Sequence, residues 1–262
     1  MAVRLSGFDG KVTVVTGAAG GIGASVCRAL AACGAVVAAV DDDVAGLGRL
    51  VAERDGDCRR KVVAYPGDVA VDRSAREILP RVEREWGPVD GLVNVAGILR
   101  AGSALSCTAE DWSSSMAVNA TGVFLWSKAV AARMAARGTG AIVTVASNAI
   151  GVPRMGMSAY TASKAAAAAY TLGLGLEVAP RGVRCNVVCP GTTETAMLAQ
   201  LGPDAAAAAV RGDPAAYRVG IPNGRVARPQ DVADAVVFLL SDQARHITLH
   251  SLYVDGGAAL RG

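Results

Sequence analysis

The sequence predicts an α/β fold: one domain built on a doubly wound parallel sheet of about seven strands, with helices on both faces. Short runs rich in β-branched residues alternate with longer segments of helical periodicity, as in chains that wind strand–helix–strand. The strand-like runs are apolar at successive positions, which indicates burial on both faces of the sheet. No Pro/Ser-rich linker or charge block divides the 262 residues, so we interpret 1–262 as a single domain.

The expected elements follow one another along the chain. The first strand is rich in valine and precedes a glycine cluster, after which the first helix begins. The later strands are equally short, and the helices between them show apolar residues at helical spacing. We expect strands at 12–16, 36–40, 62–65, 91–95, 141–146, 183–188 and 252–254, and helices at 22–32, 44–54, 73–86, 109–137, 159–179 and 231–241.

One segment, at about 192–228, interrupts this alternation. It carries Pro203, Pro214 and Pro222 and an alanine tract at 205–209. Connections of this length in a compact domain are usually functional. We therefore expect a lid over a substrate site, with a short surface helix of no special function as the alternative.

Composition and charge exclude several classes of function. Lys and Arg total 26 against 23 Asp and Glu, and no basic patch with interleaved aromatic residues suggests nucleic-acid binding. No apolar run reaches the ~18 residues that span a bilayer. Residues 1–10 show no apolar leader segment, so we expect a cytoplasmic protein without membrane partners. Six cysteines should then be reduced and packed as small apolar residues: Cys27, Cys33, Cys58, Cys107, Cys185 and Cys189.

A glycine-rich turn follows the first strand and opens the first helix. It reads Thr16-Gly17-Ala18-Ala19-Gly20-Gly21-Ile22-Gly23. Glycine lets the backbone turn tightly and approach a pyrophosphate, and the helix N-terminus favours an anion. In this position the turn predicts a Rossmann-type dinucleotide site, and a purely structural turn is the alternative.

An acidic residue at the end of the second strand indicates which dinucleotide binds. Asp41, followed by Asp42 and Asp43, lies about twenty residues after the glycine turn. A carboxylate here can accept hydrogen bonds from the adenosine ribose and would repel a 2′-phosphate. The turn also lacks Arg and Lys, so NAD is favoured over NADP. A solvated acidic turn is the alternative, more plausible for Asp42 and Asp43 than for Asp41.

Tyr160 and Lys164 are four residues apart in a predicted helix, so their side chains share one face. A phenol is a poor base near neutral pH, and a neighbouring ammonium favours the phenolate and lowers the pKa. A tyrosine tuned in this way can exchange a proton with a substrate hydroxyl or carbonyl. The pair alone is weak evidence, because both residue types are common.

Together these stretches resemble the short-chain dehydrogenase/reductase family, in the family's order and over nearly the whole chain. One departure lies in Asn94-Val95-Ala96-Gly97, after the fourth strand, where Val95 stands in place of the second Asn that the family often has. The resemblance implies that Tyr160 is the general acid/base, Lys164 tunes it and holds the nicotinamide ribose, Ser147 stabilises the reacting oxygen, and Asn119 holds a relay water. It implies cofactor contacts from Gly17, Gly21, Ile22, Gly23, Asp41, Asp68, Val69, Asn94, Ala96, Gly97, Tyr160, Lys164, Pro190, Gly191, Thr193 and Thr195. Ser147 capping a turn and Asn119 bending its helix are the alternatives.

Four segments resemble, more narrowly, the 2,3-dihydro-2,3-dihydroxybenzoate dehydrogenases of catecholate siderophore biosynthesis, and Val95 fits that subfamily. The segments are 92–100, 142–160, 182–188 and 246–257. The resemblance implies NAD-dependent oxidation of a small carboxylated cyclohexadiene diol, with Ser147 and Tyr160 at the substrate. Arg154 or Arg100 would bind the substrate carboxylate, and Arg154 is the stronger candidate. For each, the alternative is a solvated surface arginine without this role.

Other functions remain open from the sequence. A dehydrogenase of 2,3-dihydro-3-hydroxyanthranilate in secondary metabolism, to which Asn148 is equally suited, is one. A generic short-chain alcohol dehydrogenase or 3-oxoacyl reductase is another, and a nucleotide-binding regulator without turnover is a third. His246 and His250 lie four apart outside a confident helix and lack a third ligand, so we predict no metal. The apolar helix 159–179 needs cover on two sides, which agrees with the homotetramers usual in the family.

Overall fold

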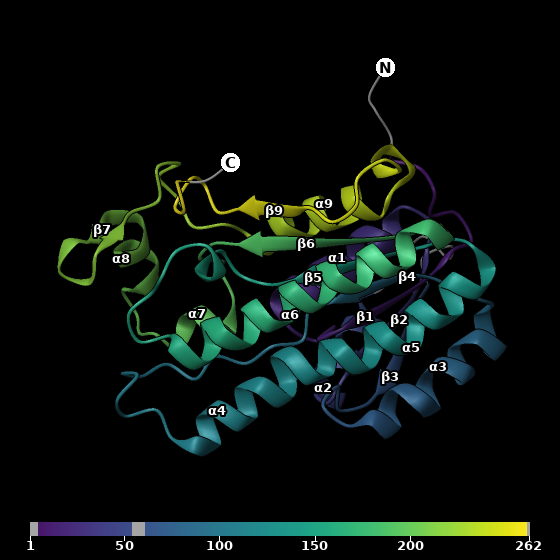
Figure 1. Ribbon diagram of the computed structural model, residues 1–262, viewed down its shortest axis with the longest axis horizontal. Helices are drawn as coiled ribbons and strands as arrows, with labels where there is room; N and C mark the ends of the chain where they lie inside the picture. Colours follow the sequence, from purple (N-terminus) through teal and green to yellow (C-terminus); the bar gives the residue numbers. More distant parts are fainter. Residues whose placement is uncertain (1–4, 54–60, 261–262) are drawn as a thin grey trace.

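Seven parallel strands form one sheet in the order β3-β2-β1-β4-β5-β6-β9 (Figure 1). The structure is a computed structural model that describes residues 5–53 and 61–260. Strand β1 is buried at all five of its positions, as expected for a strand covered on both faces. The strands are β1 (Val12–Thr16), β2 (Val36–Asp41), β3 (Lys61–Pro66), β4 (Val89–Asn94), β5 (Gly140–Val145), β6 (Val183–Pro190) and β9 (Ser251–Val254).

Two layers of helices cover the sheet, one on each face. Helices α1 (Gly21–Ala32), α2 (Val44–Ala52) and α9 (Pro229–Leu240) share one apolar core with the sheet, to which Leu30, Leu47 and Val236 contribute. Helices α3 (Asp72–Trp86), α5 (Gly122–Arg137) and α6 (Ser158–Val178) cover the opposite face, where Leu79 and Trp126 are buried. The doubly wound α/β fold predicted from the sequence is confirmed.

The chain changes direction across the sheet between β1 and β4. Strands β2 and β3 lie on one side of β1, and β4, β5, β6 and β9 lie on the other. In open parallel sheets, ligands bind outside the carboxyl ends of the strands at such a switch point. Here those ends carry the loops that follow Thr16 and Asn94, and the backbone amide of Val95 donates to the Thr16 carbonyl oxygen at 3.2 Å.

The helix expected at 109–137 is not continuous. It consists of α4 (Ala109–Met116), a π-helical turn η1 (Ala117–Thr121) and then α5. Periodicity does not detect one extra residue in a helical turn, and such turns occur frequently at functional sites. The helix expected at 44–54 ends at Ala52; Arg54 and Cys58 lie outside the described residues.

The segment 192–228 forms a small lobe at one end of the sheet, at the left of Figure 1. It contains α7 (Ala196–Ala199), α8 (Ala205–Arg211), and the antiparallel hairpin of β7 (Gly212–Asp213) and β8 (Arg218–Val219) around a 3₁₀ turn, η4 (Pro214–Ala216). Ala209, Ile221 and Val226 pack with Ala258 in a separate apolar cluster. Short 3₁₀ turns η2 (Asn148–Ile150), η3 (Ala179–Arg181) and η5 (Asp242–Ala244) complete the elements.

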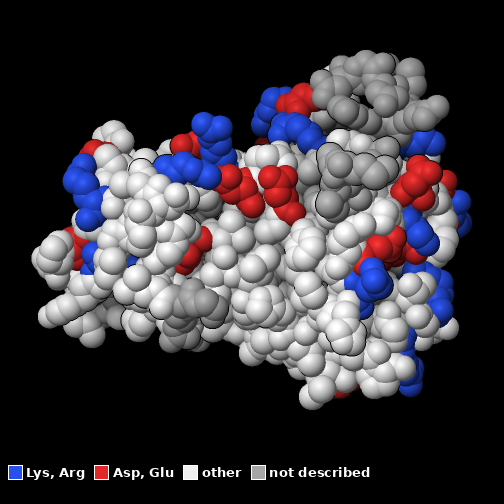
Figure 2. Space-filling model, turned by 90° about the horizontal axis from the view of Figure 1, so that it is seen from above, with Lys and Arg blue, Asp and Glu red and all other residues white. Residues whose placement is uncertain are grey.

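Charge is mixed on the surface. Figure 2 shows Lys and Arg interspersed with Asp and Glu on the face in view. Pairs such as Arg225–Asp231 form on the surface of the molecule. The structure thus agrees with the balanced composition. Within the described ranges, no helix combines the length and apolarity needed to cross a membrane.

Candidate active site

Two adjoining cavities open at the carboxyl ends of the strands. One, of about 300 Å³, is lined by Ser147, Tyr160 and Lys164, and the other, of about 600 Å³, by Gly17 and Asp41. The second cavity is called the dinucleotide cleft below, and the first the reaction cavity. The two are continuous, because both are lined by Ile22, Val95, Gly97, Leu99, Thr195 and Met197.

Helix α6 carries Tyr160 and Lys164 to the reaction cavity, as their spacing predicted, while Ser147 arrives from the end of β5. The Ser147 hydroxyl accepts a hydrogen bond from the backbone amide of Ala149 at 3.2 Å, so it caps η2 while facing the cavity. It also hydrogen-bonds Tyr160. The sequence predicted that these three side chains meet, and the structure brings them together from two elements.

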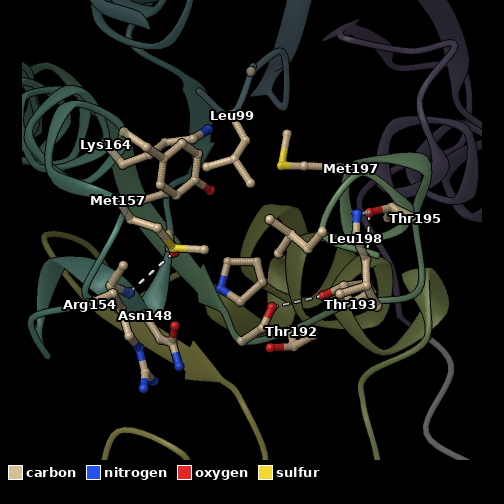
Figure 3. Close-up of a pocket in the computed structure, with 18 of the residues that line it drawn as sticks. Leu99, Asn148, Arg154, Met157, Lys164, Thr192, Thr193, Thr195, Met197 and Leu198 are labelled. Atoms are coloured by element: carbon tan, nitrogen blue, oxygen red, sulfur yellow. Dashed lines mark hydrogen bonds between the residues drawn. The ribbon is translucent and has the colours of Figure 1, made fainter. Parts of the chain in front are cut away.

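Lys164 is almost entirely enclosed. Its side chain is 4% exposed, and its ammonium donates to the backbone carbonyl oxygen of Val145 at 3.0 Å. Burial lowers the pKa of Lys164 to about 8, because desolvation disfavours the charged form. Figure 3 shows its amino group near Leu99, at the opposite side of the cavity from Arg154 and Asn148.

The expected direction of the Tyr160 pKa was wrong for this structure. Burial raises the pKa of Tyr160 above its ordinary value, and the hydrogen bond with Ser147 opposes that rise. The spacing of Tyr160 and Lys164 predicts that they are neighbours, but not how far each is removed from water. Desolvation of the buried phenol therefore sets the direction of the shift in the Tyr160 pKa.

Asn119, in the π-helical turn, is buried and fully engaged. Its amide oxygen accepts from the backbone amide of Ile98 at 2.8 Å, and its amide nitrogen donates to the Ile98 carbonyl oxygen and to the Ser163 hydroxyl, both at 2.9 Å. The side chain joins the loop after β4 to α6, and it lines neither cavity. Its geometry is that of a positioning residue, and the relay water predicted for it stays a prediction.

The glycine turn shapes the floor of the dinucleotide cleft. Gly17 has a φ of 68°, and a Cβ atom there would lie 2.5 Å from the backbone nitrogen of Ala96, so only glycine fits. Gly20 precedes α1 without a side-chain cap, which leaves the amides of the first helical turn available. A dinucleotide pyrophosphate fits this open helix N-terminus.

Three carboxylates lie at one end of the dinucleotide cleft. Asp41 accepts hydrogen bonds from the backbone amides of Ala19 at 2.9 Å and Asp43 at 3.0 Å, so it ties the glycine turn to the end of β2. Burial, together with the neighbouring Asp41, raises the pKa of Asp42. Arg49 also lines the cleft, but its guanidinium lies 3.4 Å from Asp43. Among the described residues that line it, this end of the cleft is acidic, and its one cation, Arg49, is paired.

The remaining residues predicted to contact cofactor divide into three groups. Asp68, Val69 and Ala96 line the dinucleotide cleft together with the glycine-turn residues. Asn94 does not: its amide donates to the hydroxyls of Ser127 and Thr144, because the end of β4 turns this side chain into the interior. The third group lines the reaction cavity and consists of Pro190, Gly191, Thr193 and Thr195, of which Thr195 also lines the dinucleotide cleft.

The two arginines predicted to bind a carboxylate are separated. Arg154 is half-buried and lines the reaction cavity, whereas Arg100 is exposed and lines the dinucleotide cleft. In the loop after β4, Leu99 lines both cavities, whereas the next residue, Arg100, lines the dinucleotide cleft alone. The geometry thus favours Arg154 and places Arg100 away from Tyr160.

Arg154 shares one end of the cavity with a buried polar pair. The Asn148 amide donates to the Asp255 carboxylate at 3.1 Å, and both side chains are buried. Burial lowers the pKa of Arg154, the charge of Arg218 lowers it further, and Asp255 opposes both. A positively charged guanidinium that is removed from water at the edge of a cavity is suited to bind an anion.

Beyond Thr193 and Thr195, which were predicted from the sequence, the segment 192–228 adds residues to the reaction cavity that sequence reasoning missed. Arg218, on β8, is the cation among them, and no motif in the sequence marks it. The larger apolar side chains of the wall come from this segment and from the loops after β4 and before α6, and they include Leu99, Met155, Met157, Met197, Leu198 and Leu201. Such a wall suits a small ring with polar substituents at one end.

Among the residues that the structure describes, no histidine or cysteine lines either cavity. In the part of the chain that the structure describes, no group of three or more His, Cys, Asp or Glu is placed to hold a metal ion. Cys27, Cys185 and Cys189 are buried without disulfides, as predicted, and Cys189 belongs to β6, which extends beyond the expected strand end. Cys33 and Cys107 are only partly buried.

A model of the family described as enoyl-(acyl carrier protein) reductase matches residues 17–259. A solved short-chain type dehydrogenase/reductase from Mycobacterium marinum superimposes with a TM-score of 0.88 at 31% identity, covering 96% of each chain. The chain belongs to the short-chain dehydrogenase/reductase family. It is therefore an oxidoreductase, and the family implies a nicotinamide cofactor.

Two similar proteins share a name that bears on the substrate. The 2,3-dihydro-2,3-dihydroxybenzoate dehydrogenase of Bacillus subtilis is 48% identical, covering 98% of this chain and 99% of that protein. The protein of the same name from Escherichia coli is 41% identical, covering 97% of this chain and 98% of its own length.

Proposed function

We propose that this oxidoreductase converts 2,3-dihydro-2,3-dihydroxybenzoate to 2,3-dihydroxybenzoate with NAD, as a step of catecholate siderophore biosynthesis. The observation that carries the proposal is the reaction cavity itself. It holds a Ser–Tyr–Lys set at one side, an apolar wall and Arg154 at the other side, and it adjoins the dinucleotide cleft. The names of the similar proteins support the same substrate.

The substrate suits these groups chemically. Oxidation removes a hydride from one ring carbinol and a proton from its hydroxyl, which leaves a ketone. The ketone tautomerises to the aromatic catechol, and the gain of aromaticity draws the oxidation forward. When bound, NAD accepts the hydride, and its cationic nicotinamide ring favours the phenolate form of a neighbouring tyrosine.

Each residue has a defined part in this proposal. Tyr160 accepts the hydroxyl proton, and Ser147 donates a hydrogen bond to the oxygen on which charge develops. Lys164, held by the Val145 carbonyl, keeps a positive charge behind the tyrosine, and it would hold the nicotinamide ribose of a bound cofactor. Arg154 binds the ring carboxylate, and the apolar wall holds the ring.

NAD rather than NADP is the proposed cofactor because of the acidic end of the cleft. Asp41 has both oxygens directed to backbone amides of the loop, and Asp42 and Asp43 add negative charge beside it. A 2′-phosphate would be repelled there, whereas ribose hydroxyls would find acceptors.

An absorbance assay at the NADH band tests the proposal. The purified protein receives NAD or NADP with the dihydrodiol acid, with 2,3-dihydro-3-hydroxyanthranilate or with a simple cyclic alcohol, and a 3-oxoacyl thioester is offered with the reduced cofactors. We expect the highest kcat/KM for the dihydrodiol acid with NAD. A higher kcat/KM for any other pair would overturn the proposal and identify the substrate class instead.

A homotetramer is part of the proposal. Exposed apolar side chains lie on the helices that cover one face of the sheet: Trp112 on α4, Phe124 on α5 and Leu176 on α6. These helices pack against one another, with Phe124 and Tyr170 in an edge-to-face contact. Light scattering should give the mass of four chains, and a monomeric mass would refute this part.

A further inference from the structure

Two arginines from different parts of the chain face the reaction cavity. Arg154 lies on the loop before α6, and Arg218 lies on β8 in the hairpin of the segment 192–228. Both side chains are half-buried. Among the described residues that line this cavity, Arg154, Lys164 and Arg218 are cationic and only Asp213 is acidic. The charge of the wall therefore favours an anion.

Most of the hydrogen-bonding capacity of the two guanidinium groups is unused. Arg218 donates to the Thr192 hydroxyl at 3.0 Å. In the ranges 5–53 and 61–260 it has no other acceptor and no ion pair, and Arg154 has neither. A guanidinium offers five N–H groups in a planar fork that matches a carboxylate. Several donors on each side chain are thus available to a ligand.

The nearby carboxylates are committed elsewhere. Asp213 is opposite Arg218 in the hairpin register, but its carboxylate accepts from the backbone amides of Ala215 and Ala216 at 3.0 and 3.3 Å. Asp255 accepts from Asn148 and from the backbone amides of Gly257 and Ala259. Neither acid forms an ion pair with Arg154 or Arg218, although Asp255 offsets part of their repulsion.

The two guanidinium groups are close enough to influence each other. After burial, the positive charge of Arg218 is the main cause of the lowered pKa of Arg154. Two like charges at the edge of one partly desolvated cavity repel, and an anion between them removes that repulsion. The arrangement is therefore that of a binding site for an anion.

We propose that Arg218 is a second carboxylate-binding residue, which with Arg154 forms a two-sided clamp on the ring carboxylate of the substrate. This inference rests on the proposed function and deepens it. Thr192 lies two residues after the end of β6 and lines the reaction cavity, so the hydrogen bond from Arg218 already ties the hairpin to the cavity wall. A carboxylate in the clamp adds a second tie, so the hairpin closes over an anionic ring more firmly than over a neutral one.

Binding of two products that differ only in the carboxylate tests the clamp. Isothermal titration with the NAD-loaded protein compares 2,3-dihydroxybenzoate with catechol, for wild type, Arg218→Gln, Arg218→Lys and Arg211→Gln. Arg211 is the matched control, since it lies in the same segment, exposed, and pairs with Asp204 instead of facing the cavity. Thermal melting of each variant verifies its fold.

We expect wild type to bind 2,3-dihydroxybenzoate more tightly than catechol, and Arg218→Gln to lose ~10–100-fold of that preference with catechol affinity unchanged. Arg218→Lys should retain part of the preference, and Arg211→Gln all of it. An Arg218→Gln protein that keeps the full preference, or a wild type that shows none, overturns the clamp. Carboxylate-dependent binding without turnover of the dihydrodiol acid would refute the proposed function while leaving the clamp intact.

Discussion

A Cβ atom at Gly97 would lie 2.8 Å from the Lys164 ammonium nitrogen and 3.2 Å from the Asn119 amide oxygen. The loop after β4 therefore packs directly against the side chain that positions Tyr160. Glycine at this site allows the contact between the loop and α6, and any larger residue must displace Lys164 or the loop.

Gly97→Ala should consequently lower kcat by at least ~10-fold, because Lys164 moves from its place behind Tyr160. Steady-state kinetics with the dihydrodiol acid measures the change. Gly48→Ala is the matched control, since its added methyl group meets nothing within 4 Å on the exposed side of α2. An unaltered kcat in Gly97→Ala would show that Lys164 does not depend on this contact.

Tyr160→Phe should lose ~10²–10⁴-fold in kcat, because the proton acceptor is removed, while the fold stays intact. Tyr217→Phe serves as the control, since Tyr217 is 89% exposed at the tip of the hairpin. Kinetics and circular dichroism of both variants check the prediction. Comparable losses in the two variants would contradict the role of Tyr160.

Ser147→Ala should shift the pH–rate profile as well as lower kcat by about 10²-fold. The hydrogen bond with Ser147 lowers the pKa of Tyr160, so its loss raises that pKa. Oxidation requires the phenolate, and the rising limb of kcat/KM should therefore move to higher pH. A limb that stays in place would exclude Ser147 as a tuning group for Tyr160.

Lys164→Met should change how stability depends on pH. The pKa of Lys164 falls from 10.5 to about 8 on burial, so between those values the unfolded chain binds the additional proton. The wild-type free energy of unfolding should then rise with pH across this window relative to Lys164→Met, by at most about 3 kcal/mol at ~1.4 kcal/mol per pKa unit.

Denaturant unfolding of both proteins at pH 7.5 and 10 measures this difference. Lys128→Met, which removes an exposed lysine from α5, should differ from wild type by a constant amount over the same range. If the Lys164→Met and wild-type curves run parallel, the ammonium is not desolvated as the structure indicates.

Asp41→Ala should weaken the binding of NAD and reduce the preference of the enzyme for NAD over NADP. The variant loses an acceptor for ribose hydroxyls and two hydrogen bonds that hold the glycine turn. We expect KM for NAD to rise by about tenfold, with a smaller change for NADP. Asp72→Ala removes an exposed acid that pairs with Arg76 on α3 and should leave both constants unchanged. An unaltered NADP-to-NAD ratio of kcat/KM would refute the role of Asp41.

The strands were predicted to within one or two residues at most boundaries, because apolar runs covered on both faces differ clearly from the amphipathic helices between them. The π-helical turn was not predicted. Within this turn Asn119 bonds to the backbone of Ile98, a contact between segments that periodicity cannot detect. The side chain of Asn94 was expected to contact the cofactor, but it points into the interior and bonds to Ser127. A motif shows which loop a residue precedes, and not which way its side chain points.

The sequence by itself determined the elements, their order, the glycine turn and the helical pairing of Tyr160 with Lys164, since each depends on local spacing along the chain. Tertiary structure decided which charges face one cavity. It separated Arg100 from Arg154, brought Arg218 from a hairpin 64 positions after Arg154, and buried Lys164 until its pKa fell to about 8. Distance in space and exclusion of water set these properties, and neither is written in the spacing of residues.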